Sequence, residues 1–195
     1  ARTSSQGIDY ISKFINSTDN IKHIIVQELP ETPESFIHLD MVFTLLDNDR
    51  CMVYEPLIMK KSKYATLHLI IENKKIKSIK EVSNIPSILN DLGMPVKPIS
   101  CGNGKFQYQE REQWHSGANF FAFAPGKIIG YERNTNTIEA LNNDGFEVLK
   151  ATDVISGKKN VDDYKKVVVT IQGSELSRGG GGARCMTMPI RRTKI

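Results

Sequence analysis

Hydrophobic and polar residues follow two periods along this chain, and one region shows both in close succession. Residues 119–124 form an apolar run that predicts a buried strand, and after a Pro-Gly turn residues 127–131 predict the returning strand of a hairpin. Residues 135–143 carry apolar side chains at helical spacing, and residues 146–149 predict a closing strand. The region therefore predicts a strand-strand-helix-strand (ββαβ) unit.

An earlier stretch has the same pattern with an addition. It predicts a hairpin, an added hairpin, a short helix that ends at Gly93, and a closing strand; these elements span residues 41–46 and 51–54, 66–73 and 75–79, 85–92, and 96–99.

The first part of the chain resembles the second half of such a unit. Residues 5–14 predict a helix with Ile8, Ile11 and Phe14 on one face, and residues 21–29 predict the strand after it. The opening hairpin of this unit is missing. Because repeat units bury their core against their neighbours, we expect that upstream sequence is lost and that residues 1–195 are a single C-terminal portion of a larger domain.

Composition and charge exclude several classes of protein. The 195 residues are 39% hydrophobic and 25% charged, which is typical of a globular domain. No apolar run reaches the roughly 20 residues of a membrane helix, and the first residues lack the apolar core of a signal peptide, so we expect a cytoplasmic protein. The net charge of +4 is spread along the chain, and only residues 178–182 suggest nucleic acid, which we do not expect as a partner.

The cysteine pattern is compatible with a free thiol that acts as a nucleophile. Cys51, Cys101 and Cys185 are odd in number and widely spaced, which argues against a disulfide framework, and no CxxC pair indicates zinc. Cys185 follows a run of glycines that includes Gly180 and Gly181 and comes directly after Arg184. Such a loop allows positive φ and close backbone approach to a ligand, and a nearby cation favours a thiolate. The alternative is a flexible tail with a buried cysteine.

Two other clusters carry polar side chains. If residues 38–40 are extended, His38 and Asp40 share a face and can transfer a proton and hold a cation, although a surface pair is the simpler interpretation. The second cluster, residues 111–114, ends in Trp114, the single tryptophan, for which we expect a place in the core.

Taken in order, these segments resemble the arginine deiminase family. Five motifs carry the resemblance, with an Arg-Thr-Ser segment at residues 2–4 as a sixth likeness: His-Leu-Asp-x-Val-Phe-Thr at 38–44, Arg-Glu-Gln-Trp at 111–114, Ala-Pro-Gly at 124–126, Tyr-x-Arg-Asn at 131–134, and Arg-Cys-Met-x-Met-Pro at 184–189.

The resemblance implies a fold and a reaction. The family fold is a five-bladed α/β propeller of ββαβ units, the pentein fold, of which this chain would hold about three blades. The reaction hydrolyses the guanidino group of L-arginine to citrulline and ammonia through a covalent S-alkylthiouronium intermediate on cysteine. No cofactor and no metal are expected.

The resemblance also assigns roles to residues. It implies that Cys185 is the nucleophile, that His38 is the acid/base, and that Asp40 binds the guanidinium nitrogens. Arg2 matches an arginine that holds the substrate carboxylate. The resemblance also implies that the glycine loop contacts the substrate, through Gly180, Gly181 and Arg184.

Several departures from the family pattern matter. Segments that supply further carboxylates lie upstream in the family, and their loss would cost about 3–5 kcal/mol each if a buried guanidinium is left unpaired. Gly180 stands where the family often has an arginine, and Ser116 where it usually has an aspartate. We therefore expect the isolated chain to be weakly active or inactive.

Two alternatives stay open. The chemistry is shared by agmatine deiminases and amidinotransferases. A partial propeller also exposes an apolar edge, so the chain could be a non-catalytic module that self-associates or needs an N-terminal partner.

Overall fold

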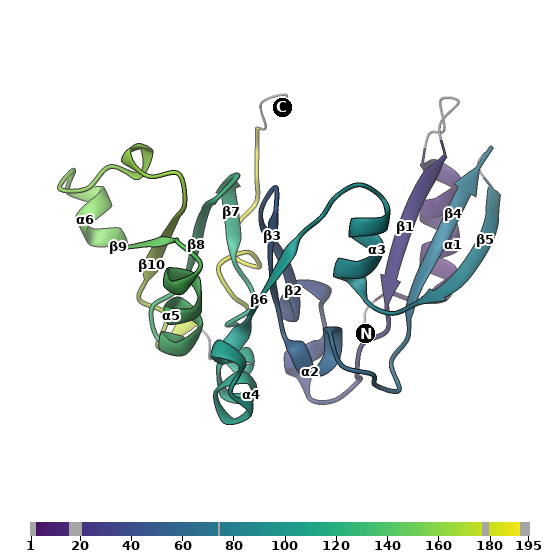
Figure 1. Ribbon diagram of the computed structural model, residues 1–195, viewed down its shortest axis with the longest axis horizontal. Coiled ribbons are helices and arrows are strands. Elements are labelled where there is room, and N and C mark those ends of the chain that lie inside the picture. The colour runs from purple at the N-terminus through teal and green to yellow at the C-terminus, as the bar shows by residue number, and fades with distance from the viewer. Residues whose placement is uncertain (1–2, 16–20, 74, 177–179, 192–195) are drawn as a thin grey trace.

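The computed structural model shows a mixed α/β protein. It describes residues 3–15, 21–73, 75–176 and 180–191. Within these residues the strands form three sheets, which lie one after another along the long axis of the molecule (Figure 1). Among the helices in this part of the chain, none is long and apolar enough to cross a membrane.

The sheet around the Pro-Gly turn has one strand more than expected. Its order is β7-β8-β10-β9, with the first pair antiparallel and the other two pairs parallel. The predicted hairpin and helix are confirmed, but the expected closing strand, β9, pairs with β10 and not with β8. The elements are β7 (Phe121–Ala124), β8 (Lys127–Tyr131), α5 (Thr135–Asn143), β9 (Glu147–Lys150), α6 (Ala151–Ile155) and β10 (Val167–Ile171).

The reason for this difference lies in β10. Its residues Val167, Val168, Val169 and Thr170 are all buried, as expected of a strand that is covered on both faces. A central place in the sheet suits such a run better than an edge, so β10 lies between β8 and β9. Conversely, β7 is only partly buried, and its Phe123 is exposed, although a buried strand was expected.

The middle sheet follows the predicted order more closely. Strand β3 pairs antiparallel with β2 and parallel with β6, so that hairpin, helix and closing strand form one unit with the second hairpin inserted. Its elements are β2 (Phe43–Asp47), β3 (Arg50–Val53), α2 (Glu55–Ile58), α3 (Ile85–Asp91) and β6 (Lys97–Ser100). Helix α3 ends before Gly93, whose φ of 83° fits the expected glycine stop.

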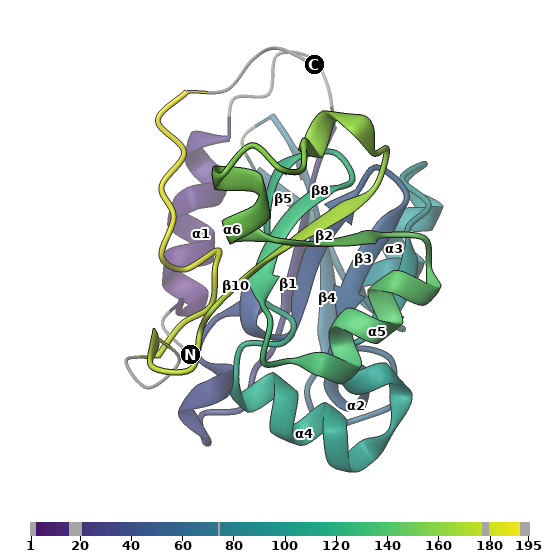
Figure 2. The ribbon, with the colours of Figure 1, turned by 90° about the vertical axis from the view of Figure 1, so that its left-hand side faces the viewer.

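The inserted hairpin completes a sheet with the N-terminal strand. β1 (Lys22–Gln27) pairs antiparallel with β4 (Thr66–Glu72), which pairs with β5 (Lys75–Val82). The strand predicted near residues 21–29 therefore finds its partners downstream in the chain. Helix α1 (Ser5–Phe14) lies against this sheet, behind it in Figure 1 and at its outer side in Figure 2.

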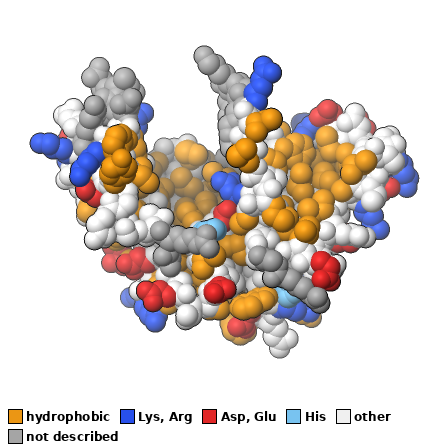
Figure 3. Space-filling view, turned by 180° about the vertical axis from the view of Figure 1, so that it is seen from behind, with side chains coloured by type: hydrophobic (Ala, Val, Ile, Leu, Met, Phe, Trp, Pro, Cys, Tyr) orange, Lys and Arg blue, Asp and Glu red, His pale blue; other side chains and the backbone are white. Residues whose placement is uncertain are grey.

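The apolar face of α1 points away from the protein. Tyr10, Ile11 and Phe14 are 63%, 53% and 66% exposed, whereas Ser12 is buried. The predicted helix is thus confirmed, but its hydrophobic stripe does not contribute to the core. Figure 3 shows the whole molecule from behind, the side on which α1 lies, and hydrophobic side chains gather toward the left and the right of this view.

The main core lies between the middle sheet and the four-stranded sheet. Leu46, Met52, Phe120, Ile128 and Phe146 are among its fully buried members. The backbone N–H of Gly126 in the β7–β8 turn donates to the Leu46 carbonyl, which joins the two sheets directly. This junction brings the loop before β7 close to the segment before β2, where the candidate site lies.

Candidate active site

The structure brings three of the predicted site residues together. Ligand-type atoms of His38, Asp40 and Cys185 all lie within 4.8 Å of one another. The Cys185 Sγ is 3.9 Å and 4.0 Å from the two carboxylate oxygens of Asp40. His38 and Asp40 are half-buried and Cys185 is exposed, so an imidazole, a carboxylate and a thiol share one accessible place.

The segment that carries His38 and Asp40 is not the extended strand that was expected. His38 has an extended backbone, but residues Leu39–Met41 form a 3₁₀ turn, and β2 begins only at Phe43. The two side chains therefore meet because the turn folds them toward the same sulfur, and not because of strand alternation.

Buried side chains hold this turn in place. The Gln113 Nε2 donates to the carbonyls of Ser35 (2.7 Å), which precedes the turn, and of Met41 (3.3 Å), its last residue. The Thr44 hydroxyl lies 2.5 Å from the Ala118 carbonyl and 3.3 Å from that of Asp40. Gln113 and Thr44 are both buried, so these bonds fix the backbone of Asp40 from within.

The glycine loop has the conformation that its sequence predicts. Gly180 and Gly181 have φ values of 74° and 110°, which other residues rarely adopt. A Cβ at Gly181 would lie 3.0 Å from the Cys185 Cβ. The buried Tyr131 donates its hydroxyl to the Gly181 carbonyl at 3.1 Å. Within the described residues this is a shaped loop, and the interpretation as a tail with a buried cysteine is wrong.

Asn119 joins the loop to the turn, and in the sequence it stands out only as the asparagine two residues after Gly117, downstream of the 111–114 motif. The side chain is 1% exposed. Its Nδ2 lies 3.2 Å from the Cys185 Sγ and 3.1 Å from the Asp40 carbonyl. Its Oδ1 accepts from the backbone N–H groups of Arg184 (2.9 Å) and Cys185 (3.3 Å). Only the tertiary fold reveals these contacts.

The surroundings of Cys185 favour the protonated thiol. Loss of water around the sulfur raises the pKa of Cys185, and the Asp40 carboxylate raises it further, against hydrogen bonds from Gly182 and Asn119 that lower it. The cation expected to favour the thiolate, Arg184, pairs with the neighbouring carboxylate, with its Nε 3.6 Å from the Asp40 Oδ2.

The other two cysteines are unsuited to nucleophilic chemistry. Cys51 and Cys101 are free and fully buried, and burial raises the pKa of each thiol to about 12. Cys185 is therefore the cysteine that can meet a substrate.

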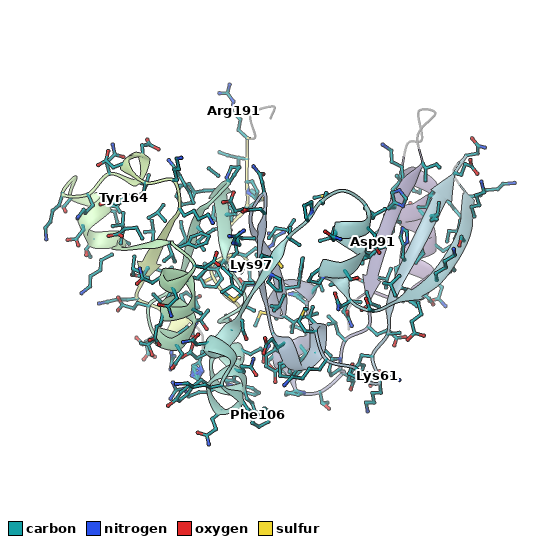
Figure 4. All side chains as sticks on the ribbon, viewed as in Figure 1. Lys61, Asp91, Lys97, Phe106, Tyr164 and Arg191 are labelled. Atoms are coloured by element: carbon teal, nitrogen blue, oxygen red, sulfur yellow. The ribbon has the colours of Figure 1, made fainter. Side chains whose placement is uncertain are left out.

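The Arg111–Trp114 motif supports the site from outside it. It lies on α4 (Phe106–Trp114), whose first residue points away from the protein (Figure 4). Glu112 is buried and accepts from the backbone N–H groups of Asn136 and Thr137 at the start of α5. Trp114 is 58% exposed, so the expectation of a core tryptophan is wrong.

Some expectations are not tested by the described residues. Arg2 lies outside them, as do residues 178 and 179 of the stretch 178–182. The His38, Asp40 and Cys185 atoms lie close enough to hold a metal ion, so the expectation of a metal-free site stays a prediction.

Comparison with known proteins identifies the relatives of this chain. A family model described as arginine deiminase matches residues 1–192. The chain is 32% identical to an arginine deiminase of Oenococcus oeni over 196 residues and 35% identical to one of Mycoplasma capricolum subsp. capricolum over 197 residues. These matches cover 100% of this chain but only 42% and 43% of the relatives, so the chain spans less than half of their length.

Proposed function

The chain belongs to the arginine deiminase family, and we propose that it supplies the C-terminal part of a site that hydrolyses L-arginine to L-citrulline and ammonia. The observation that carries this proposal is the meeting of the Cys185 thiol, the Asp40 carboxylate and the His38 imidazole within 4.8 Å, although 145 residues separate Asp40 from Cys185. A nucleophile, an anion for a cationic substrate and a proton carrier are the groups that guanidinium hydrolysis needs.

Asp40 suits a guanidinium group. A carboxylate presents two oxygens that match the paired N–H donors of a guanidinium. In the structure the Arg184 guanidinium already lies beside this carboxylate, with its Nε 3.6 Å from Oδ2. In the proposed complex the substrate guanidinium takes this place, and its carbon faces the Cys185 sulfur.

The chemistry then follows in two steps. The Cys185 thiolate adds to the guanidinium carbon, and one terminal C–N bond breaks as that nitrogen takes a proton from His38 and leaves as ammonia. Water that gives its proton to His38 adds to the same carbon of the S-alkylthiouronium. The C–S bond breaks as the added hydroxyl gives its remaining proton to the released ammonia, and the products are citrulline, ammonium and the Cys185 thiolate.

The raised pKa of Cys185 gives the substrate a role in this chemistry. Partial loss of water around the sulfur and the Asp40 carboxylate raise the pKa of Cys185, which favours the thiol in the free chain. A guanidinium bound between Asp40 and the sulfur neutralises that carboxylate and adds a positive charge, and both changes favour the thiolate. Attack is thereby linked to the binding of a cation.

We further propose that the complete site needs a five-bladed propeller of which this chain holds about three blades. Asp40 is the one carboxylate in the grouping with Cys185 and His38 among the described residues. The outward apolar face of α1 supports a further packing partner, because exposed apolar surface of this kind marks an interface. The isolated chain should therefore release little or no citrulline. The same face supports the non-catalytic alternative, in which the chain acts only as an assembly module.

Trapping the covalent intermediate tests the proposed nucleophile. The chain is incubated with L-arginine, quenched in acid, digested and examined by mass spectrometry. We expect a peptide with Cys185 that carries the mass of arginine less ammonia, and no adduct after Cys185→Ala. Because one attack needs fewer groups than turnover, the adduct should form slowly even if citrulline release is negligible. An adduct on Cys51 or Cys101 instead would contradict the assignment.

A further inference from the structure

We propose that Asn119 is a positioning residue, which holds the Cys185 sulfur against Asp40 and donates a hydrogen bond to it. The inference rests on the proposed function only in taking Cys185 as the nucleophile. Asn119 lies just before β7, in a loop that follows α4, and belongs to neither of the two segments that it joins.

Both polar atoms of the Asn119 side-chain amide make hydrogen bonds. Its Oδ1 accepts from the N–H groups of Arg184 and Cys185 and so fixes the backbone of the loop. Its Nδ2 lies within hydrogen-bond distance of the Asp40 carbonyl and of the Cys185 Sγ. One planar group thus contacts both segments and helps to set the distance between nucleophile and carboxylate.

The loop is shaped around this side chain. A Cβ at Gly182 would lie 2.4 Å from the Asn119 Oδ1 and 2.6 Å from its Cβ. Real Cβ atoms do not approach this closely, so the glycine at this position admits Asn119 to the loop. The need for a glycine at 182 is therefore a consequence of Asn119, and not of backbone conformation.

A structural role and a positioning role predict opposite effects on the thiol. If Asn119 only stabilises the loop, its removal admits water to the sulfur and moves the pKa of Cys185 down toward the ordinary value. If it donates to the sulfur, its replacement by leucine, which fills similar space without a donor, moves the pKa up. Aspartate keeps the acceptor but places an anion beside the sulfur, so it also moves the pKa up.

The test measures the rate of Cys185 alkylation by iodoacetamide against pH in the full 195-residue chain, with the modified cysteine identified by mass spectrometry. For Asn119→Leu and Asn119→Asp we expect the midpoint of the profile to rise by at least about half a pH unit, or roughly a threefold slower reaction below the midpoint. Protection of the buried Cys51 and Cys101 reports in the same sample whether each variant is folded.

Asn134 provides the matched control. It is also 1% exposed, and its Nδ2 donates to the His115 carbonyl, away from the glycine loop. Asn134→Leu and Asn134→Asp should leave the midpoint for Cys185 unchanged. A midpoint that is unchanged or lowered in folded Asn119 variants would overturn the proposal. The proposal would also be overturned if both Asn119 variants unfold while the Asn134 variants stay folded, because Asn119 would then serve only the stability of the fold. Neither result depends on arginine turnover.

Discussion

At the scale of single residues, the main feature of the site is a carboxylate that opposes the ionisation of a nearby thiol. Cys185 would be more nucleophilic as a thiolate, yet Asp40 lies within 4.0 Å of the sulfur and opposes ionisation. In the proposed function Asp40 binds the substrate cation, and its effect in the free chain is to raise the pKa of Cys185. A positively charged group bound between Asp40 and the sulfur would neutralise the carboxylate and favour the thiolate.

Replacing Asp40 by asparagine should therefore make Cys185 more reactive toward a neutral reagent. Asp40 raises the pKa of Cys185, so its removal lowers that pKa, and the thiolate fraction rises at any pH below it. Release of Arg184 from its ion pair acts in the same direction. We expect about a threefold faster alkylation of Cys185 by iodoacetamide near pH 8 for a shift of half a unit.

A suitable control for this variant is Asp153→Asn, a change on α6 that removes a carboxylate remote from the site in sequence and fold. Its alkylation profile should match that of the unmodified chain. An Asp40→Asn rate that is equal or slower would mean that Asp40 does not govern the charge state of the sulfur.

The three side chains that the structure brings together were predictable from the sequence, but the bonds that position them were not. Cys185 is recognisable because a cysteine follows a run of glycines, and His38 and Asp40 because they lie two residues apart in one motif. Asn119 and Tyr131 act through bonds to segments more than 45 residues away. Such bonds leave no local pattern, because an asparagine or tyrosine at these places is equally compatible with a turn or a core.

At the scale of elements, α4 and α5 are joined by a buried carboxylate. Asn134, the N-cap of α5, makes no capping bond with its side chain, and Glu112 from α4 supplies the missing acceptor. Its Oε1 accepts from Asn136 N and Nδ2, and its Oε2 from Thr137 N and Oγ1, at 2.7 to 3.0 Å. A negative charge at a helix N-terminus is also favoured by the helix dipole.

Glu112→Gln should destabilise the protein because its amide NH₂ would face donors in place of an acceptor. We expect a loss of about 2 kcal/mol in the free energy of unfolding, from unpaired buried N–H groups and a lost charge interaction. Urea unfolding followed by circular dichroism measures it. Glu110→Gln, an exposed change on the same helix, should have little effect, and equal stabilities of the two variants would contradict the capping role.

Elements were predicted where the pattern is local. The hairpins β2-β3, β4-β5 and β7-β8, and the helices α1, α3 and α5, form close to their expected ranges. Strand order was not predictable, because a uniformly apolar run such as β10 carries no information on which neighbour it chooses. The 3₁₀ turn at Leu39–Met41 was missed because three residues are too few to show a period.

At the scale of the whole molecule, the stripe on α1 is the feature that the described fold does not use. The rings of Tyr10 and Phe14 contact each other in a tilted arrangement at a centroid distance of 4.7 Å, but both residues stay more than half exposed. The sequence predicted the helix correctly, but its periodicity could not show whether the apolar stripe packs against the rest of the chain. The proposed propeller gives this surface a function in assembly.

The measurement that tests the account most directly is citrulline release from L-arginine by three proteins. These are the 195-residue chain, a fusion in which the upstream part of the Mycoplasma capricolum relative precedes it, and the same fusion with Cys185→Ala. We predict little or no citrulline from the chain alone, clear release by the fusion, and none from the Cys185→Ala fusion. Equal release by both fusions would contradict Cys185 as the nucleophile, and no release by a folded fusion would contradict the deiminase function and favour a non-catalytic module.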